Sequence, residues 1–286
     1  MPQLLVYDDG RGQWGPLIDL RAAFDLRSGA QTTLERIQRV LGSPGADLWV
    51  RQPDLAPLVT EQYGRAVNQL NGRPLLCVNG RWPGIRCSEQ IRALKVGMAL
   101  VQSDGQVIGA HLESATARNL LERGELPGGT TAQRVDENLL MDRPWHLLDQ
   151  LETTLPADLA ASGLPCLEDG GRGAVCFGRH PVQVAPDAQL QPQVVFNSEQ
   201  GAIVVESGAL IGALAVLEGP CYIGRDSQVV CHAHIRPHTV IGPVCKAAGE
   251  ISFSIMQGFS NKAHHGYLGH SLVGQWVNLG AATSVS

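Results

Sequence analysis

A group of polar residues near the carboxyl end of the 286-residue sequence has the types needed for proton transfer. Lys262, His264, His265 and Tyr267 lie close together, and Asn278 follows Tyr267 by eleven residues. Imidazole has the ordinary pKa closest to neutrality, so a histidine here is suited to take the proton from an amine that attacks a thioester. The alternative is an ordinary polar loop, in which Tyr267 covers a core and Asn278 pairs with its neighbours in a ladder.

Arg236 and the amino-terminal motif Gly10-Arg11-Gly12 are candidates for binding phosphate. A planar guanidinium donates two parallel hydrogen bonds to a phosphate group, which Arg236 offers better than a lysine would. Glycine lets a backbone approach phosphates closely, although so short a motif also fits a plain turn at a strand end. Arg236 could equally be a solvated surface arginine.

Arg21 and Arg27 add two cations downstream of the glycine motif. Nucleotidyl transfer gathers negative charge on phosphoryl oxygens, so it needs cations there and usually carboxylates that hold Mg²⁺. Asp8 and Asp9, directly before the motif, are candidate carboxylates. The two arginines could instead form surface ion pairs with acidic residues nearby in the sequence.

Length and composition limit the classes to which the protein can belong. A chain of 286 residues suggests about two domains at roughly 150 residues each. The net charge is −5 and the lysines are scattered, which disfavours a nucleic-acid partner. No apolar run approaches the roughly 18 to 20 residues of a membrane span, and the first residues lack a signal-peptide pattern. We therefore expect a cytoplasmic protein with no membrane partner.

Residues 1–162 alternate between short apolar runs and helical patterns, which is typical of an α/β fold. Thr32 and Glu35 have the spacing of a capping box and predict a helix through Val40. Asp104-Gly105 predicts a tight turn between two strands. Strands are predicted at 4–8, 47–51, 75–79 and 98–102, and further helices at 87–95, 114–122 and 143–155.

A stretch rich in Gly and Pro begins at residue 163, and beyond it the sequence repeats every six residues. Small residues lie four positions after each of seven branched aliphatics, which are Val205, Ile211, Leu217, Ile223, Val229, Ile235 and Ile241. An amphipathic helix would need spacings of three and four, and an ordinary strand a spacing of two. This hexapeptide repeat predicts a parallel β-helix whose axis is filled by the aliphatic residues.

The repeat is interrupted at 247–266 and resumes two residues out of phase, with Tyr267, Val273, Leu279 and Val285 in the aliphatic slot. This predicts a loop that leaves the coil, and loops on rigid scaffolds are where sites are built.

Four residues of the repeat are of the types that bind zinc, and a zinc site is therefore an alternative interpretation; they are Cys231, His232, His234 and His238. Residues six apart lie on different faces of such a coil, so these side chains should not converge on one metal. The seven cysteines are odd in number and include no C-x-x-C pair, so we expect reduced thiols.

The segments SNKAHHGYLG and VGQWVNLGAAT resemble the acetyl-transfer site of the bifunctional N-acetylglucosamine-1-phosphate uridyltransferase/glucosamine-1-phosphate acetyltransferase family. The resemblance implies a left-handed β-helix, a homotrimer and acetyl-coenzyme A as co-substrate. It implies His264 as the general base. It also implies amino-sugar contacts from Tyr267 and Asn278, and a phosphate contact from Arg236.

Two departures from the family pattern affect this site. The family's sugar-binding lysine falls at Ser252, so either Lys262 contacts the substrate instead or phosphate binding is weaker. The family continues for several coils past the position of Ser286, so we expect a truncated form with impaired acetyl transfer.

The first half is similar, more loosely, to the nucleotidyltransferase half of the same enzymes, through PLIDLRAAFDLRSGAQTTLERI, LLCVNGRW and RPWHLLDQL. The resemblance implies a sugar phosphate and UTP, or another nucleoside triphosphate, as substrates and Mg²⁺ as the cofactor. The family's metal-binding aspartate corresponds to Asn79, so the metal ligands stay unknown. The expected nucleotide-binding residues are Gly10, Arg11, Gly12, Arg21, Arg27 and Asn79.

We therefore predict an α/β nucleotidyltransferase-like domain at 1–162, a linker or covering loop at 163–183, and a left-handed parallel β-helix, acyltransferase-like, at 184–286. The predicted function is synthesis of UDP-N-acetylglucosamine for the cell envelope, by nucleotidyl transfer in the first domain and N-acetyl transfer in the second. The alternative is a non-catalytic trimeric scaffold or sugar-phosphate-binding protein.

Overall fold

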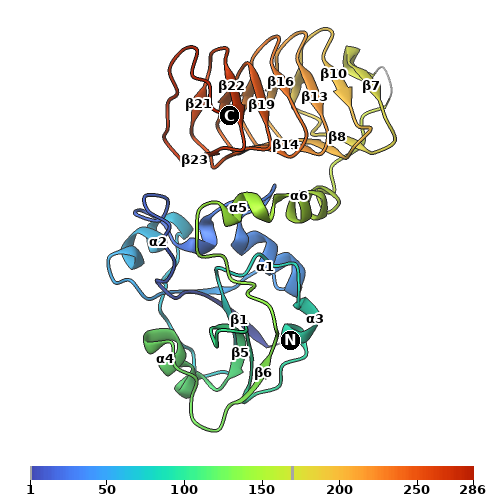
Figure 1. Ribbon diagram of the computed structural model, residues 1–286. Helices are drawn as coiled ribbons and strands as arrows, with labels where there is room; N and C mark the ends of the chain where they lie inside the picture. Colours follow the sequence, from blue (N-terminus) through green and yellow to red (C-terminus); the bar gives the residue numbers. More distant parts are fainter. Residues whose placement is uncertain (1, 169–170) are drawn as a thin grey trace. The chain divides into compact units, whose positions relative to one another are not determined.

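The computed structural model describes residues 2–168 and 171–286. The chain divides into two compact units. Unit 1 consists of Met1–Leu26 and Gln31–Pro144, and unit 2 consists of Arg27–Ala30 and Trp145–Ser286. Unit 1 is a sheet with helices and unit 2 is mainly a coil of short strands (Figure 1). Buried hydrophobic side chains form separate clusters in the two units.

Unit 1 contains one six-stranded mixed sheet, with strand order β2-β1-β3-β5-β4-β6. Strand β1 pairs in parallel with β2 and β3, whereas β5 is antiparallel to both β3 and β4. All four predicted strands and the turn at Asp104-Gly105 are confirmed. The strands are β1 (Gln3–Asp8), β2 (Asp47–Val50), β3 (Leu75–Asn79), β4 (Met98–Val101), β5 (Val107–Leu112) and β6 (Thr131–Arg134).

Four α-helices cover the two faces of this sheet. Helices α1 (Thr33–Leu41), α2 (Leu55–Tyr63) and α3 (Ser88–Arg92) contribute apolar side chains to one face, and α4 (Ser114–Arg123) to the other. The predicted capping box is present: the Glu35 amide donates to the Thr32 hydroxyl, and the Thr32 amide donates to the Glu35 carboxylate. A short 3-10 helix, Ala23–Asp25, precedes α1.

The order of the strands creates a switch point at the carboxyl end of β1. From β1 the chain passes through α1 to β2 on one side, and then through α2 to β3 on the other side. The two connections diverge there, and open α/β sheets bind their ligands in the crevice that this divergence leaves. Residues just after β1 and β3 are therefore placed to form a site.

Unit 2 begins with two helices, α5 (His146–Asp149) and α6 (Leu151–Leu159), and continues as a left-handed parallel β-helix (Figure 1). A short 3-10 helix at Gly171–Gly173 precedes the first coil strand. One sheet contains β7 (Val175–Phe177), β10 (Val195–Asn197), β13 (Val216–Glu218), β16 (His234–Ile235), β19 (Glu250–Ser252) and β22 (Tyr267–Gly269).

The other two sheets complete the triangular coil. The second contains β8 (Val182–Val184), β11 (Ile203–Val205), β14 (Cys221–Ile223), β17 (Thr239–Ile241), β20 (Ile255–Met256) and β23 (Leu272–Val273). The third contains β9 (Gln189–Leu190), β12 (Leu210–Ile211), β15 (Gln228–Val229), β18 (Lys246–Ala247) and β21 (Asn261–Lys262). The first coil strand, β7, lies inside the segment 163–183 that was expected to be a linker, and the second, β8, begins within it.

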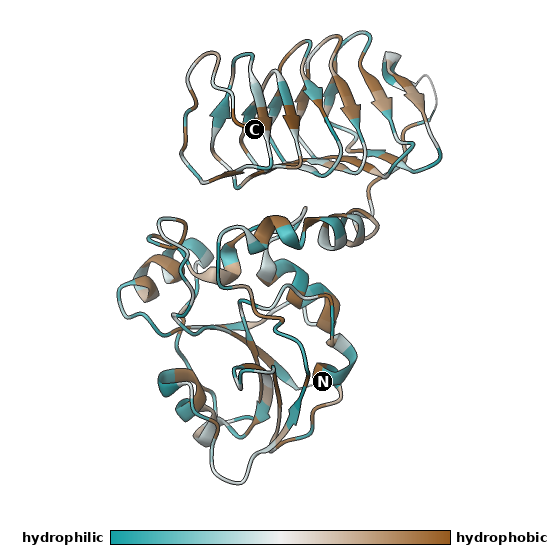
Figure 2. Ribbon diagram, viewed as in Figure 1, coloured by the Kyte–Doolittle hydropathy of each residue, from teal (hydrophilic) through white to brown (hydrophobic). Residues whose placement is uncertain are grey.

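The hexapeptide repeat determines the core of the coil. All seven predicted aliphatic residues from Val205 to Ile241 are fully buried, and hydrophobic residues recur along the strands (Figure 2). Glycines such as Gly212 lie where a Cβ would stand 2.4 Å from the backbone of the next coil, so no larger residue fits there.

The segment 247–266 differs from the prediction, because it stays in the coil instead of leaving it as a loop. It contributes β19, β20 and β21, which pair in register with the preceding coil. Val240 pairs with Ile255, a spacing of 15 residues, whereas Tyr222 pairs with Val240 at 18. The turns that connect these strands are therefore shorter than in the preceding coil, and this shortening shifts the phase of the six-residue repeat. Leu268, not Tyr267, continues the buried column after Ile251.

No helix in the described parts of the chain has the length and apolar character needed to cross a membrane. All seven cysteines are free thiols, as the sequence predicts.

Candidate functional site

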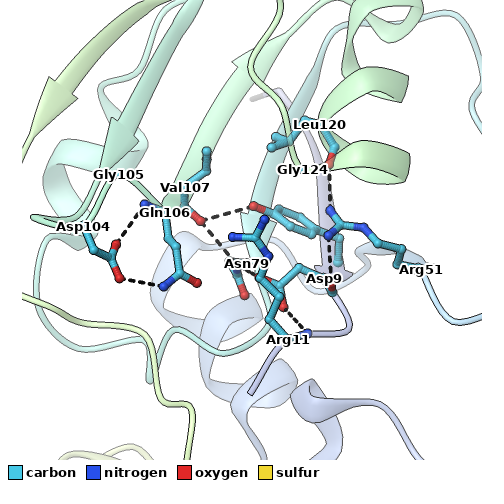
Figure 3. Close-up of a pocket in the computed structure, with 11 residues that line it drawn as sticks. Asp9, Arg11, Arg51, Asn79, Asp104, Gly105, Gln106, Val107, Leu120 and Gly124 are labelled. Carbon is cyan, nitrogen blue, oxygen red and sulfur yellow. Dashed lines mark hydrogen bonds between the residues drawn. The ribbon is translucent and has the colours of Figure 1, made fainter. Parts of the chain in front are cut away.

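A cavity of about 220 Å³ lies in unit 1 at the switch point of the sheet (Figure 3). It is formed where β1 and β3 end and β5 begins, with α4 at one side. The lining residues are Tyr7, Asp9, Arg11, Arg51, Asn79, Asp104, Gly105, Gln106, Val107, Leu120 and Gly124. The sequence-predicted Arg11 and Asn79 are among them.

Asp9, at the end of β1, is the centre of a buried polar network. Its Oδ1 accepts hydrogen bonds from Arg81 Nε at 2.9 Å and from the Arg11 amide at 3.1 Å. Its Oδ2 accepts from Arg81 Nη2 at 2.7 Å and from Asn79 Nδ2 at 3.0 Å. Burial by itself would raise the pKa of Asp9, but the hydrogen bonds and charge of Arg81 outweigh it and lower the pKa. The lowered pKa favours the carboxylate form of Asp9, which is paired with a buried guanidinium.

The glycine motif folds back onto the aspartates that precede it. The Gly10 amide donates to Asp8 Oδ1 at 2.8 Å, and the second oxygen of Asp8 accepts from the Ala23 amide at 2.6 Å. Gly10 and Gly12 have φ of 64° and 96°, values that favour glycine. Burial raises the pKa of Asp8, and these two backbone bonds oppose that rise. The amides of Gly10 and Arg11 thus bind aspartate oxygens of their own turn.

Arg51 closes the side of the cavity formed by α4. Its Nη2 donates to Leu120 O at 2.9 Å and its Nε to Leu121 O at 3.0 Å, which satisfies carbonyls at the carboxyl end of the helix. Its Nη1 donates to Asp9 O at 2.8 Å. The helix ends at Gly124, with φ of 78°, where a Cβ would lie 3.3 Å from guanidinium nitrogens of both Arg51 and Arg11. The missing side chain of Gly124 leaves room for two arginines.

Asp104 lies in the β4–β5 turn on the other side of the cavity. Its Oδ1 accepts from the Gln106 amide at 2.9 Å and from Gln102 Nε2 at 3.0 Å. Its Oδ2 accepts from Gln106 Nε2 at 2.6 Å and from Gln102 Nε2 at 3.0 Å. A small degree of burial raises the pKa of Asp104, and the Gln106 bonds lower it below its ordinary value.

Two predicted nucleotide-binding arginines lie outside the cavity lining. Arg21 is partly buried, and this burial lowers its pKa although the nearby Asp25 carboxylate opposes the effect. Arg27 belongs to unit 2, where its guanidinium donates to Ala30 O and stands 5.9 Å from the centre of the Tyr222 ring. The position of Arg27 thus differs from the prediction, because its chain segment packs with the coil.

The residues of the cavity do not fit Mg²⁺. A carboxylate offers about four lone-pair positions, and both lining carboxylates, Asp9 and Asp104, already accept four hydrogen bonds each. Asp8 is 2% exposed and does not line the cavity. In the described ranges 2–168 and 171–286, no group of three or more His, Cys, Asp or Glu is arranged to hold a metal ion.

The coil brings together some of the residues predicted for acetyl transfer. Glu250 on β19 pairs with His234 on β16 and with Tyr267 on β22, so these side chains occupy one face. Arg236 Nη1 donates to Glu250 Oε1 at 3.0 Å, which together with the charge of Glu250 raises the pKa of Arg236. Arg236, the predicted phosphate ligand, is thus hydrogen-bonded to Glu250.

The other predicted residues of the coil lie nearby or on a different face. His264 and His265 are exposed in the turn before β22. Asn278 is exposed and pairs with Asn261 in the third sheet. Within one chain, His264 and Tyr267 are neighbours, and Asn278 belongs to a separate face.

Lys262 is placed differently from the prediction. Its side chain occupies an axis position of the coil, in register with Ala247, and is 1% exposed. Its Nζ donates to Ala248 O at 3.0 Å and to His264 O at 2.9 Å. Burial lowers its pKa. Lys262 therefore holds the backbone of the turn that carries His264 and does not face a substrate.

Several lining residues were missed because no sequence motif contains them. Arg51 follows β2 and Gln106 precedes β5, and the pairing of the strands brings both residues to the cavity that Asp9 lines. Tyr7 is buried, and its hydroxyl donates to Val107 O at 3.2 Å across the sheet. Arg81, which binds Asp9 without lining the cavity, could have been found as a charged residue two positions after the buried strand that ends at Asn79.

Comparisons with known proteins identify the family of the chain. A family model described as "Sugar nucleotidyl transferase" matches residues 3–163. The proteins named "Bifunctional protein GlmU" from Jannaschia sp. (strain CCS1) and Anaplasma marginale (strain Florida) are 34% identical over 102 residues and 33% over 105. These matches cover 35% and 36% of this chain, and 22% and 24% of the two relatives.

A third relative of the same name, from Sphingopyxis alaskensis, is 32% identical over 103 residues, covering 35% of this chain and 22% of its own length. The matched segments thus span less than a quarter of the length of these curated relatives. The family model covers more than half of this chain and includes every residue that lines the cavity. The chain therefore belongs to the sugar nucleotidyl transferase family of transferases.

Proposed function

We propose that unit 1 transfers a nucleotidyl group from a nucleoside triphosphate, UTP in our proposal, to a sugar 1-phosphate. The observation that carries this proposal is the cavity at the switch point, which lies within the segment matched by the sugar nucleotidyl transferase model. In the reaction, an oxygen of the sugar phosphate attacks the α-phosphorus of UTP, and the bond to pyrophosphate breaks. The residues must therefore stabilise negative charge on phosphoryl oxygens.

Arg11 is the lining residue best suited to contact that charge. Arg51 and Arg81 donate to backbone carbonyls and to Asp9, as described above. Arg11 is exposed and lines the cavity. In the part of the chain that the structure describes, its guanidinium has no hydrogen-bond partner. A planar guanidinium donates two parallel hydrogen bonds to a phosphate group. Arg11 in this proposal orients the triphosphate.

The test is the release of pyrophosphate by purified protein given UTP and N-acetylglucosamine 1-phosphate. We expect Arg11→Ala to lower the rate by at least about tenfold, the effect of losing roughly 1.4 kcal/mol of transition-state binding. Arg86→Ala is the matched control, because Arg86 is an exposed arginine that pairs with Glu137 away from the cavity lining. Absence of pyrophosphate release from the unmodified protein would refute the proposal.

We further propose N-acetyl transfer from acetyl-coenzyme A to glucosamine 1-phosphate at the coil, as part of UDP-N-acetylglucosamine synthesis in the cytoplasm. Support comes from the relatives named as bifunctional and from the exposed His264 beside Tyr267. Asn278 lies on another face of the coil, so a homotrimer that combines faces of neighbouring subunits is part of this proposal. Loss of thiol release in His264→Ala, with His265→Ala as the matched comparison, tests it.

One observation favours a second candidate function, the binding of a sugar phosphate without catalysis. The carboxylates and the loop amides around the cavity are engaged with one another. This alternative predicts that UTP or N-acetylglucosamine 1-phosphate binds in isothermal titration calorimetry and that neither pyrophosphate nor thiol appears in the assays above.

A further inference from the structure

The central carboxylate of the unit 1 cavity, Asp9, is already paired with a buried cation that does not itself line the cavity. The Arg81 guanidinium is 1% exposed and binds both oxygens of Asp9, at 2.9 Å and 2.7 Å. A bidentate arginine–carboxylate pair of this kind is geometrically specific and strong. It occupies two of the lone pairs through which a carboxylate would bind a divalent metal.

The remaining lone pairs of Asp9 are used as well. The Arg11 amide and Asn79 Nδ2 complete a set of four donors around the carboxylate. Asn79 contributes an amide where a carboxylate would add charge, and its Nδ2 also contacts Val107 O at 3.3 Å. A metal could bind Asp9 only after displacing hydrogen bonds that are largely buried, which is costly.

Arg81 is itself held in place from four directions. Besides the two bonds to Asp9, its Nη1 donates to Met141 O at 3.1 Å and its Nη2 to Gln106 Oε1 at 2.6 Å. The amide of Arg81 donates to Asn79 Oδ1 at 3.0 Å. The guanidinium is thus fixed behind Asp9, in contact with residues that line the cavity.

The charge of the cavity then suits a phosphate without a metal ion. The guanidiniums of Arg11 and Arg51 and the carboxylates of Asp9 and Asp104 belong to the cavity lining, and a third guanidinium, that of Arg81, binds Asp9 without lining the cavity. Of the three, Arg11 is an exposed residue of the lining, and its guanidinium has no hydrogen-bond partner among the described residues. A fixed internal cation would serve the electrostatic role that a metal ion serves in other phosphate sites.

We propose that the Arg81–Asp9 pair replaces the divalent metal of this site, so that the cavity binds the phosphates of a nucleoside triphosphate through Arg11 without Mg²⁺. The proposal rests on the cavity being the nucleotide site, as in the proposed function. It adds that phosphate binding here is independent of divalent metal.

The first experiment measures the Kd of UTP for the full chain by isothermal titration calorimetry, once in EDTA and once with excess Mg²⁺. We expect UTP to bind in EDTA with a Kd within about threefold of the value in Mg²⁺, and Arg11→Ala to weaken binding at least about tenfold in both buffers. Binding that needs Mg²⁺, or no binding in either buffer, would overturn the proposal.

The second experiment titrates Mn²⁺ alone and follows the electron paramagnetic resonance signal of the free ion. The unmodified protein should leave Mn²⁺ free. Asn79→Asp, which removes one donor from Asp9 and adds a second carboxylate, should create a binding site, and Arg81→Gln should do the same if it stays folded by circular dichroism. Mn²⁺ binding to the unmodified protein that disappears in Asp9→Asn would contradict the proposal.

These results separate the inference from the proposed function. Pyrophosphate release that requires Mg²⁺, together with UTP binding that requires Mg²⁺, would sustain nucleotidyl transfer and refute the metal-free site. UTP binding in EDTA without pyrophosphate release would sustain the metal-free site and refute the activity.

Discussion

The polar residues of the unit 1 cavity and those of the coil differ in how far they are engaged with one another. In the cavity, Asp9 and Asp104 each accept four hydrogen bonds, and Arg81, which binds Asp9 without lining the cavity, is fully buried. On the coil, His264 and Asn278 are exposed. The charged residues of the cavity therefore both stabilise unit 1 and set the charge of its site. The exposed residues of the coil are carried by a scaffold whose stability does not depend on them. Substitutions should consequently unfold unit 1 more readily than unit 2.

The largest expected effect is that of Arg81→Met. Removing the guanidinium leaves Asp9 charged and buried without its partner, and breaking a buried pair costs about 3–5 kcal/mol. Urea unfolding followed by tryptophan fluorescence reports on unit 1, because Trp14, Trp49 and Trp82 are all buried there.

The matched control for this variant is Arg86→Met, at an exposed ion pair with Glu137. Exposed pairs contribute little to stability, so the unfolding midpoint should not move. Equal effects of the two substitutions would show that the buried network does not stabilise unit 1.

Asp25→Asn should have the next largest effect on the free energy of unfolding, and the size of this effect should depend on pH. Burial raises the pKa of Asp25 to about 6 from 3.8, although Tyr63 donates a hydrogen bond to it. The folded state therefore binds this proton more tightly, so stability is lost as pH rises from about 4 through about 6. Asp25→Asn removes that loss and should raise the free energy of unfolding by about 2–3 kcal/mol at pH 8.

The measurement is the same urea titration of Asp25→Asn and the unmodified protein at pH 4 and pH 8. The gain should shrink strongly at pH 4, where Asp25 is protonated in the folded state and partly protonated in the unfolded state. A difference between the two proteins that is the same at both pH values would contradict a titrating carboxyl at this position.

Gly124→Ala should have a smaller effect. Gly124 has φ of 78°, so alanine there costs about 1 kcal/mol. Gly64→Ala is the matched control, because Gly64 ends α2 with φ of 61° and has open space where a Cβ would be. Both should lower stability similarly. Only Gly124→Ala, which crowds Arg11 and Arg51, should also weaken UTP binding in calorimetry.

The smallest effect is expected on the coil. Arg236→Ala removes an exposed pair with Glu250, with the two side chains 46% and 40% exposed. The thermal unfolding midpoint followed by circular dichroism should stay unchanged. A clear loss of stability would show that the coil, like the cavity, depends on its charged residues.

The sequence predicted the elements whose pattern is local. The strands ending at Asp8 and Asn79, the capping box at Thr32 and the hexapeptide core were all expected and are present. Helix α2 was not expected, and it contains Pro57 in its first turn, where proline is tolerated although it suggests a break. Local propensity therefore identified most elements of unit 1.

The parts that were missed depend on three-dimensional pairing. Arg81 reaches Asp9 because β1 and β3 are neighbours in the sheet. Lys262 looked like a substrate ligand by type, yet it lies six residues after Met256 and six before Leu268, both buried in the coil. Because the corners between Ala247 and Met256 are shortened, counting hexads forward from Ile241 could not reveal this column.

A crystal structure of the chain soaked with UTP tests the central claim most directly, that the switch-point cavity is the nucleotide site. We predict that the triphosphate lies in the unit 1 cavity with its oxygens against the Arg11 guanidinium, while Arg81 remains paired with Asp9. UTP bound on the coil, or an empty cavity at a UTP concentration that saturates binding in calorimetry, would contradict the account.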